Sequence, residues 1–230
     1  MANILAIGAH PDDIEIGVGG TIAAMIDQGH NVVLCDLTNG EPTPYGTPEK
    51  RVAETEKSNA VLNVKTRVNL GLENRWLADT KEARVKLAEV YREHRPDVIL
   101  VPYEEDAHPD HVVASRLARA SRFIAKLTKT DMAGQPFYPP KIFFYLTMNL
   151  KLIVKPAIIF DISETFGKKI EAVKAFRSQF FEGPAPKGDD LIERLTVRAS
   201  FMGSQIGVKY GEPFLNLEEI GIRSFDSLLP

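Results

Sequence analysis

The feature that most constrains the fold is a fourfold alternation of short apolar runs with longer amphipathic segments in the first 127 residues. The runs are rich in β-branched residues, and the segments between them carry apolar residues at helical spacing. The alternation predicts strands at 3–9, 31–38, 67–72 and 97–103, and helices at 18–29, 47–64, 78–95 and 110–127. Because strands alternate with helices, the pattern indicates an α/β fold with a doubly wound, mostly parallel sheet.

The rest of the chain is less regular but gives no sign of a second domain. Apolar runs predict strands at 141–148 and 157–163, and helices are expected at 163–180 and 189–205. We find no internal repeat and no linker long enough to separate two domains. A chain of 230 residues is within the size of one α/β domain, so we expect a single domain over residues 1–230.

The composition argues against several classes of partner. With 28 basic and 31 acidic residues the net charge is −3, which gives no general attraction to nucleic acid or an anionic membrane. No apolar run approaches the ~20 residues that span a bilayer, and the N-terminal segment lacks the basic residues of a secretory signal. The single cysteine, Cys35, excludes an intrachain disulfide framework. We therefore expect a cytoplasmic protein with a small-molecule partner and no nucleic-acid or membrane partner.

Two similar polar clusters follow the first and the fourth predicted strands. The sequence AHPDD occupies residues 9–13, and AHPDH occupies residues 107–111. In the strand order 3-2-1-4-5, which is common in doubly wound sheets, strands 1 and 4 are neighbours and the chain reverses direction between them. Ligands bind at the carboxyl ends of the strands at such a point. The two clusters are therefore expected to form one site.

The residue types in these clusters suit a divalent metal of the zinc kind. Neutral imidazole and carboxylate are suitable zinc ligands, and a catalytic zinc keeps three protein ligands and one open position for water. His10, Asp13 and His111 would supply such a set. Asp12, adjacent to a ligand, would accept the proton of the attacking water. Another divalent ion, such as Fe²⁺, is an alternative to zinc at this site.

The second cluster contains a further histidine and aspartate. His108 is expected to donate a hydrogen bond to an oxyanion or a leaving group, with Asp110 orienting its ring. Each of these polar residues also has a structural alternative, because Asp110 begins a predicted helix, Asp13 precedes one, and aspartates often serve as helix caps. The presence of six such residues in two matching turns favours the functional interpretation.

The glycines after the first cluster raise a nucleotide-binding alternative. Gly17, Gly19 and Gly20 open a helix, and Asp36 ends the second strand where a ribose-binding acid would lie. A dinucleotide fingerprint places its glycines directly after the strand, whereas acidic residues intervene here and would repel a pyrophosphate. We therefore expect these glycines to allow close packing. A sugar- or nucleotide-binding module without turnover and a metal-dependent phosphate-ester hydrolase stay open as alternatives.

AHPDD after the first strand and HPDH after the fourth resemble the motifs of the LmbE-like de-N-acetylases, the family of the N-acetylglucosaminyl-phosphatidylinositol deacetylases. The resemblance implies a Rossmann-like fold and zinc-dependent removal of an acetyl group from an N-acetylglucosamine derivative. It also implies roles for the residues of the two clusters: metal ligands His10, Asp13 and His111, general base Asp12, and His108 with Asp110 at the tetrahedral intermediate or the leaving amine.

The resemblance extends beyond these motifs. Arg51, in GTPEKRVAE, matches the arginine of the family that meets the sugar. Tyr145 by its position is expected either to approach the reacting carbonyl or to be a packed aromatic residue of its strand. LGLENRWL, FFYLTMN and GVKYGEPF are similar to the subgroup that deacetylates N-acetylglucosaminyl-malate in bacillithiol synthesis. Malate, inositol and a further sugar all stay open as the aglycone. Family members often assemble, so the resemblance also allows a homo-oligomer.

Overall fold

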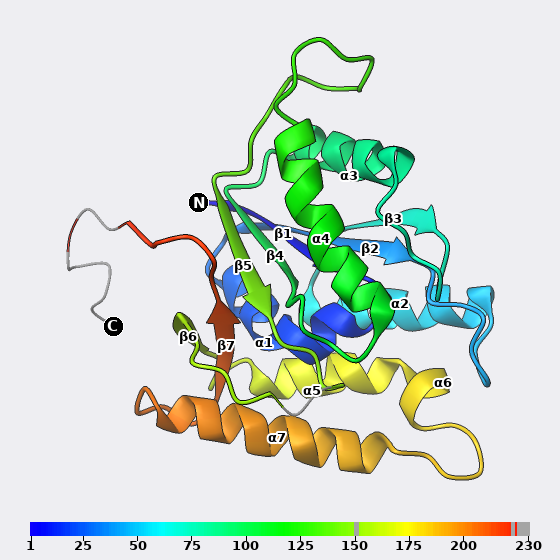
Figure 1. Cartoon of the computed structure of the whole chain (residues 1–230). Coiled ribbons are helices and arrows are strands. Elements are labelled where there is room, and N and C mark those ends of the chain that lie inside the picture. Colours follow the sequence, from blue (N-terminus) through cyan, green and yellow to red (C-terminus); the bar gives the residue numbers. More distant parts are fainter. Residues whose placement is uncertain (150–151, 222–223, 225–230) are drawn as a thin grey trace.

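Seven strands form one sheet through the molecule (Figure 1). The computed structural model describes residues 1–149, 152–221 and 224. In sheet order the strands are β3 (Thr66–Leu72), β2 (Asn31–Thr38), β1 (Asn3–Gly8), β4 (Val98–Pro102), β5 (Lys141–Tyr145), β7 (Gly211–Leu215) and β6 (Ile158–Asp161). β1 lies between β2 and β4 and is parallel to both. The predicted α/β class and the predicted order of the first five strands are therefore confirmed.

Helices cover both faces of the sheet (Figure 1). One core lies under α3 (Lys81–His94) and α4 (Pro109–Ile124), and the other lies under α1 (Asp13–Asp27), α2 (Pro48–Leu62) and α5 (Phe166–Ala175). Successive residues of β1 alternate between these two cores. The strand is therefore apolar throughout, because both of its faces are buried.

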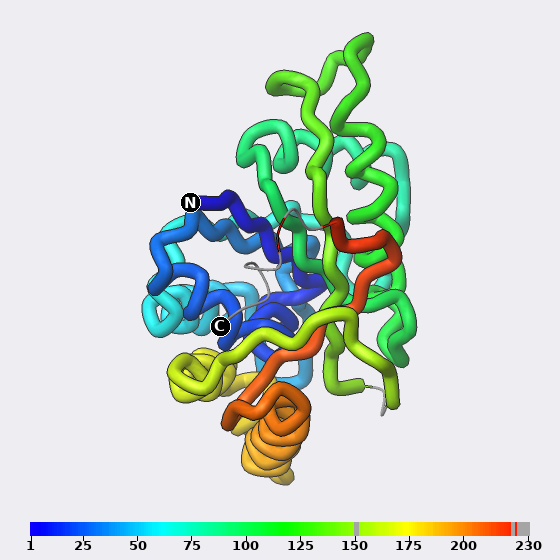
Figure 2. The backbone as a smooth tube through the Cα atoms, turned by 90° about the vertical axis from the view of Figure 1, so that its left-hand side faces the viewer, coloured from blue at the N-terminus to red at the C-terminus, as the bar shows by residue number. Residues whose placement is uncertain are grey.

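Two further helices lie outside this arrangement. α6 (Arg177–Phe180) follows α5, and α7 (Gly188–Ser204) packs along α5 through a third apolar cluster. Figure 2 shows α7 beside α5 at the edge of the molecule. Among the described residues, no helix is both long enough and apolar enough to cross a membrane.

The second half of the chain departs from the sequence prediction in two places. β7, which the sequence analysis missed, lies antiparallel between β5 and β6. The helix predicted at 163–180 is two helices, because the chain leaves helical geometry at Phe176 (φ −82°, ψ 63°). The Phe176 side chain is fully buried, so its packing outweighs the local preference for a continuous helix.

The glycines after the first cluster allow close packing, as predicted. A Cβ atom on Gly17 would lie 2.3 Å from the ring of Tyr145, and one on Gly20 would lie 2.7 Å from Ile162. Neither neighbour can move away easily, because both side chains are buried. These positions therefore bring α1 against the core rather than against a nucleotide.

β7 supports a bend in α1. The helix leaves regular geometry at Val18 (φ −138°, ψ 18°). The Glu212 carboxylate on β7 accepts hydrogen bonds from the backbone N–H groups of Gly20 (3.1 Å) and Thr21 (2.7 Å) just after the bend. The carboxylate acts as a cap for the second part of the helix, because it satisfies donors near a helix start.

Candidate metal centre and active site

The loops after β1 and β4 meet at the carboxyl edge of the sheet. The two strands are adjacent and parallel, so the segments that follow them emerge side by side. The ring of His10 lies 5.4 Å from that of His111 and 4.7 Å from that of His108, measured between centroids. Both clusters line one cavity of about 530 Å³. The predicted convergence of the two motifs is therefore confirmed.

Three side chains of the two clusters form a compact donor set. Nε2 of His111 lies 3.0 Å from Oδ1 of Asp13, and Nδ1 of His10 lies 3.4 Å from Oδ2 of Asp13. One donor atom from each of the three residues lies within 4.8 Å of the others. Two imidazoles and one carboxylate at this spacing fit a divalent cation such as Zn²⁺. We call His10, Asp13 and His111 the donor triad.

A second group of possible donors, His10, His108 and Asp110, is less suited to a metal. The oxygens of Asp110 already accept hydrogen bonds from the backbone N–H groups of Arg75 (2.7 Å) and Leu77 (3.2 Å). Oδ2 of Asp110 also lies 3.1 Å from Nε2 of His10. Asp110 therefore anchors the loop after β3 and holds the His10 ring, which leaves Nδ1 of His10 for the donor triad.

His108 is the N-cap residue of α4, and its ring faces the cavity. Nδ1 of His108 accepts the backbone N–H of Asp110 at 3.2 Å, so the neutral ring carries its proton on Nε2. Burial lowers the pKa of His108, and the charges of His10 and His111 lower it further. Asp110, which was expected to orient the His108 ring, contacts that ring through this backbone N–H, whereas its carboxylate is engaged by His10 and by other backbone N–H groups.

Asp12 occupies an unusual position in the backbone. Its backbone φ angle of 129° is one that residues other than glycine rarely adopt. Its carboxylate does not cap α1. The helix-cap alternative for this aspartate is therefore excluded. Oδ2 of Asp12 instead lies 3.2 Å from Nη1 of Arg51. Burial raises the pKa of Asp12 to about 7, although the charge of Arg51 opposes the increase.

Both histidines of the donor triad are protonated at neutral pH when no metal is bound. Burial opposes the charged ring of His10, but its hydrogen bonds to Asp110 and Asp13 outweigh burial and raise the pKa to about 9. Burial likewise opposes the charged ring of His111, but the charge of Asp13 and the hydrogen bond to Asp106 raise the pKa to about 10. A metal must therefore displace protons from both rings.

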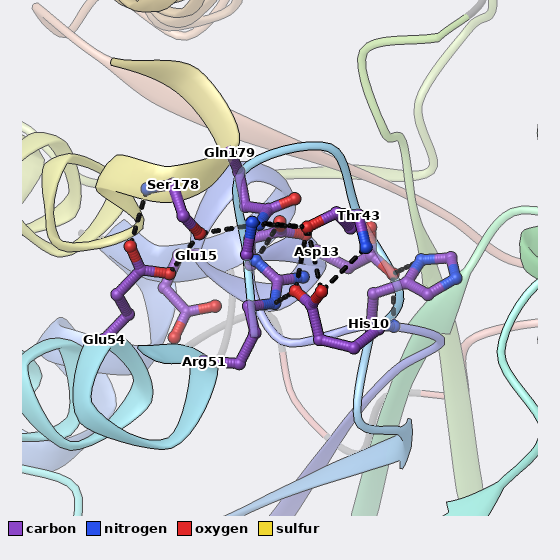
Figure 3. Close-up of polar contacts among 12 residues, drawn as sticks. His10, Asp13, Glu15, Thr43, Arg51, Glu54, Ser178 and Gln179 are labelled. Atoms are coloured by element: carbon purple, nitrogen blue, oxygen red, sulfur yellow. Dashed lines mark hydrogen bonds and ion pairs between the residues drawn. The ribbon is translucent and has the colours of Figure 1, made fainter. Parts of the chain in front are cut away.

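Arg51 lies near Thr43 and Gln179 (Figure 3), and all three line the cavity. Its side chain is only 3% exposed, and its Nε forms an ion pair with Oε1 of Glu41 at 3.6 Å. Glu54 on α2 accepts hydrogen bonds from the backbone N–H (2.6 Å) and the hydroxyl (2.8 Å) of Ser178. Gln179 donates to Thr43 at 3.1 Å. These contacts fix α6 beside Arg51.

Several cavity residues were not singled out from the sequence. They come from the loops after β3 and β5 and from the region of α6 and α7: Asn74, Arg75, Thr147, Met148, Asn149, Gln179, Phe180, Lys187, Leu191 and Arg194. Those from the loops after β3 and β5 lie in LGLENRWL and FFYLTMN, and the similarity of these two segments to the family was the sequence signal that could have identified them. The residues from the region of α6 and α7 carried no such signal, because their place at the cavity depends on the break at Phe176 and on the loop between α6 and α7.

Tyr145 is not brought to the cavity. Its hydroxyl donates to the carbonyl oxygen of Ile7 at 2.8 Å, and its side chain is fully buried. The ring packs against Gly17 in the core beneath α1. The structure does not support its expected approach to the reacting carbonyl, because its one polar group is engaged inside the core. We leave Tyr145 out of the proposed substrate-binding residues.

The fold and the site together define an α/β enzyme with a candidate metal centre at the switch point of its sheet. Comparison with known proteins identifies the family. Residues 5–121 match the family described as PIG-L, GlcNAc-PI de-N-acetylase. The chain belongs to this family, and it is a deacetylase, an enzyme that hydrolyses an amide C–N bond.

Three relatives illustrate the similarity. The diacetylchitobiose deacetylase of Thermococcus kodakarensis is 31% identical over 227 residues, which cover 92% of this chain and 82% of that protein. The 1D-myo-inositol 2-acetamido-2-deoxy-alpha-D-glucopyranoside deacetylase of Nocardiopsis dassonvillei is 32% identical, and the match covers 60% of this chain and 61% of that protein. The crystal structure of the conserved protein TT1542 from Thermus thermophilus superposes with a TM-score of 0.87 at 37% identity, covering 96% of this chain and 97% of the other.

Proposed function

We propose that this enzyme removes the acetyl group from N-acetylglucosaminyl-malate, the reaction expected in bacillithiol synthesis. The coarser part, deacetylation of an N-acetylglucosamine conjugate, is supported by the relatives, one of which is named for diacetylchitobiose and another for an inositol glycoside of acetylated glucosamine. The choice of malate is supported by the similarity of three sequence segments to that subgroup and by the charge around the cavity.

The donor triad would hold the metal, which we propose is Zn²⁺, with Fe²⁺ as the alternative. When bound, such an ion polarises the acetamide carbonyl and makes water more acidic. Asp12 accepts the water proton as the water oxygen bonds to the carbonyl carbon, and Nε2–H of His108 donates to the oxygen that becomes negative. The C–N bond then breaks, the amine takes the proton from Asp12, and acetate is released.

Arg51 is the proposed contact for the sugar. It lines the cavity beside Asp12, and its buried Nε is paired with Oε1 of Glu41 at 3.6 Å. A guanidinium offers five N–H donors in a fixed geometry, so the contact with Asp12 leaves donors for a substrate hydroxyl. The same contact keeps positive charge next to the proposed base.

The observation that carries the choice of malate is the positive charge around the cavity. Arg75, Lys187 and Arg194 line it, and each is exposed. None of the three forms an ion pair with a carboxylate in the part of the chain that the structure describes, although Nη2 of Arg75 donates to the carbonyl oxygen of Pro42. Unpaired cations at a cavity favour an anionic ligand, and the two arginines can hold a carboxylate in forked geometry. Malate carries two carboxylates, whereas inositol and a second acetylated glucosamine carry none.

The test compares three conjugates of N-acetylglucosamine with the zinc-loaded protein: the malate glycoside, the inositol glycoside and diacetylchitobiose. Free amine is measured for each. We expect kcat/KM to be at least about tenfold higher for the malate glycoside, and the advantage to shrink with added salt because the charges are exposed. Equal or better turnover of a neutral conjugate would exclude malate selection, and no amine from any conjugate would contradict deacetylation of this class.

A variant without two of these charges tests whether they cause the preference for the malate glycoside. Replacing Lys187 and Arg194 together by Gln should lower kcat/KM for the malate glycoside and leave the neutral conjugates unchanged. Replacing Arg116 and Arg119 together by Gln is the matched control, because it also removes two charges, at exposed positions of α4 that do not line the cavity. An equal loss in the control would attribute the effect to overall charge rather than to the cavity.

A further inference from the structure

The carboxylate of Asp106 lies behind one histidine of the donor triad. Oδ2 of Asp106 is 3.1 Å from Nδ1 of His111, while Nε2 of the same ring is 3.0 Å from Oδ1 of Asp13. The side chains of Asp106 and His111 are each only 4% exposed. The two ring nitrogens therefore have separate partners, with Nε2 directed toward the triad and Nδ1 held from outside it.

The Asp106 carboxylate has a full set of hydrogen-bond partners. Oδ1 accepts from the backbone N–H of His108 at 2.8 Å and from the side-chain amide of Asn149 at 3.2 Å. Oδ2 accepts from the hydroxyl of Thr147 and faces Nδ1 of His111. An ionised carboxylate offers about four acceptor positions, and four groups approach it here. Asp106 is thus held in one orientation.

This arrangement determines which nitrogen of His111 carries the proton. A carboxylate only accepts, so Nδ1 of His111 must donate to Asp106. The amide nitrogen of Asn149 also lies 3.3 Å from Nδ1, but it is a donor and cannot accept that proton. The hydrogen bond to the charged carboxylate is shorter and stronger. Nε2 is then the ring nitrogen with a lone pair for a metal.

The segment that carries Thr147 and Asn149 is itself anchored. Nη1 of Arg198 on α7 donates to the carbonyl oxygen of Thr147 at 2.7 Å. Asp106 therefore joins the loop before α4 to the segment after β5, and Arg198 joins that segment to α7. The position of His111 depends on contacts between three parts of the chain.

We propose that Asp106 is a positioning residue for the metal centre, which fixes His111 as an Nε2 ligand. The proposal rests on the donor triad holding a metal, as proposed above. Carboxylates that accept from a ligand histidine fix its ring and raise its basicity, and their loss typically costs about 10- to 100-fold in metal affinity. Asp106 itself does not line the cavity that holds the triad, so it acts through His111.

The experiment measures zinc affinity of the full chain directly. Wild type, Asp106→Asn and Asp106→Ala are stripped of metal, checked for folding by circular dichroism, and titrated with zinc in competition with a chromogenic chelator. We expect Asp106→Ala to bind zinc about 10- to 100-fold more weakly than wild type. Asp106→Asn should lose less, because an amide oxygen can still accept from Nδ1–H. If Asp106→Ala does not fold, Asp106→Asn decides.

Two further variants separate positioning from other effects. Glu105→Gln removes the same charge one residue away at an exposed position, and its zinc affinity should equal that of wild type. Thr147→Val removes one partner of Asp106 without touching His108, and it should weaken zinc binding in the same direction but less.

The outcomes are distinct. The proposal would be overturned if both Asp106 variants fold and bind zinc with the affinity of the wild type. An equal loss in Glu105→Gln would also overturn it, because long-range charge would then explain the effect. If the wild-type chain itself binds no zinc, the proposed metal centre fails instead.

Discussion

Nη1 of Arg51 lies 3.2 Å from Oδ2 of Asp12, with the arginine side chain 3% and the aspartate side chain 12% exposed. Burial pushes the Asp12 carboxyl toward its protonated form, and the guanidinium pulls it back. The balance leaves the pKa of Asp12 at about 7 in the metal-free protein. A carboxylate poised near neutrality can take a proton from water and return it to an amine.

The role of Asp12 is tested by Asp12→Asn. The amide keeps the size of the side chain but cannot accept a proton, so we expect kcat to fall by about 10² to 10⁴. Zinc content and substrate binding should stay close to wild type, because Asp12 lies outside the donor triad. Steady-state kinetics and elemental analysis check both. Near wild-type turnover would assign the base to another group, and loss of zinc would make Asp12 a ligand.

The role of Arg51 is tested by Arg51→Gln. The charge of Arg51 lowers the pKa of Asp12, so its removal should raise that pKa. The base must be ionised to act, and the acidic limb of kcat/KM against pH should therefore move to higher pH. Overall kcat/KM should also fall through weaker substrate binding, with zinc content unchanged.

Arg51→Lys is the matched control for this change. Lysine keeps the charge but loses the forked donor geometry. The acidic limb of kcat/KM against pH should therefore move less than in Arg51→Gln, while substrate binding should still weaken. An unchanged pH profile and an unchanged KM in Arg51→Gln would remove this residue from the site.

Metal binding should release protons from the donor triad. The pKa of His10 is about 9 and that of His111 about 10 without metal, so both rings are charged at pH 7 and must lose a proton to bind. Apparent zinc affinity should therefore rise between pH 7 and pH 9, by up to about tenfold per pH unit for each proton released. Calorimetric titration in two buffers of different ionisation enthalpy counts those protons.

The Asp110→Asn variant provides the comparison for proton release. In the wild type, the hydrogen bond from His10 to the Asp110 carboxylate raises the pKa of the His10 ring. Removing the carboxylate charge should therefore lower this pKa and reduce the number of protons that zinc binding releases at pH 7. Zinc binding at pH 7 with no release of protons in wild type would contradict the predicted charge state of the triad.

The close packing of α1 is tested by Gly17→Ala. The added methyl group would lie 2.3 Å from the buried ring of Tyr145, and overpacking of this kind costs about 1–3 kcal/mol of unfolding free energy. Gly167→Ala on α5 is the control, because its Cβ would meet no atom within 4 Å. It should be neutral or stabilise by about 0.5–1 kcal/mol. Urea unfolding of both variants checks the prediction, and equal stability of the two would contradict it.

Features that depend on local pattern could be predicted from the sequence. The alternation of apolar runs and amphipathic segments set the strands and helices of the first half, and the rules of doubly wound sheets placed β1 beside β4. From that adjacency the convergence of His10 and Asp13 with His111 followed from the sequence alone. The glycines of α1 were also correctly interpreted as packing residues.

The contacts between individual side chains could not be predicted from the sequence and follow from the folded arrangement. This arrangement directed the carboxylate of Asp110 to His10 rather than to His108, placed Asp106 on His111, and paired Arg51 with Asp12. It also buried Phe176 at the break between α5 and α6, and inserted β7 between β5 and β6. Local periodicity specifies which segments form strands and helices. Hydrogen bonds and core packing depend instead on side-chain directions and on distances of a few ångströms between segments that are far apart in the chain.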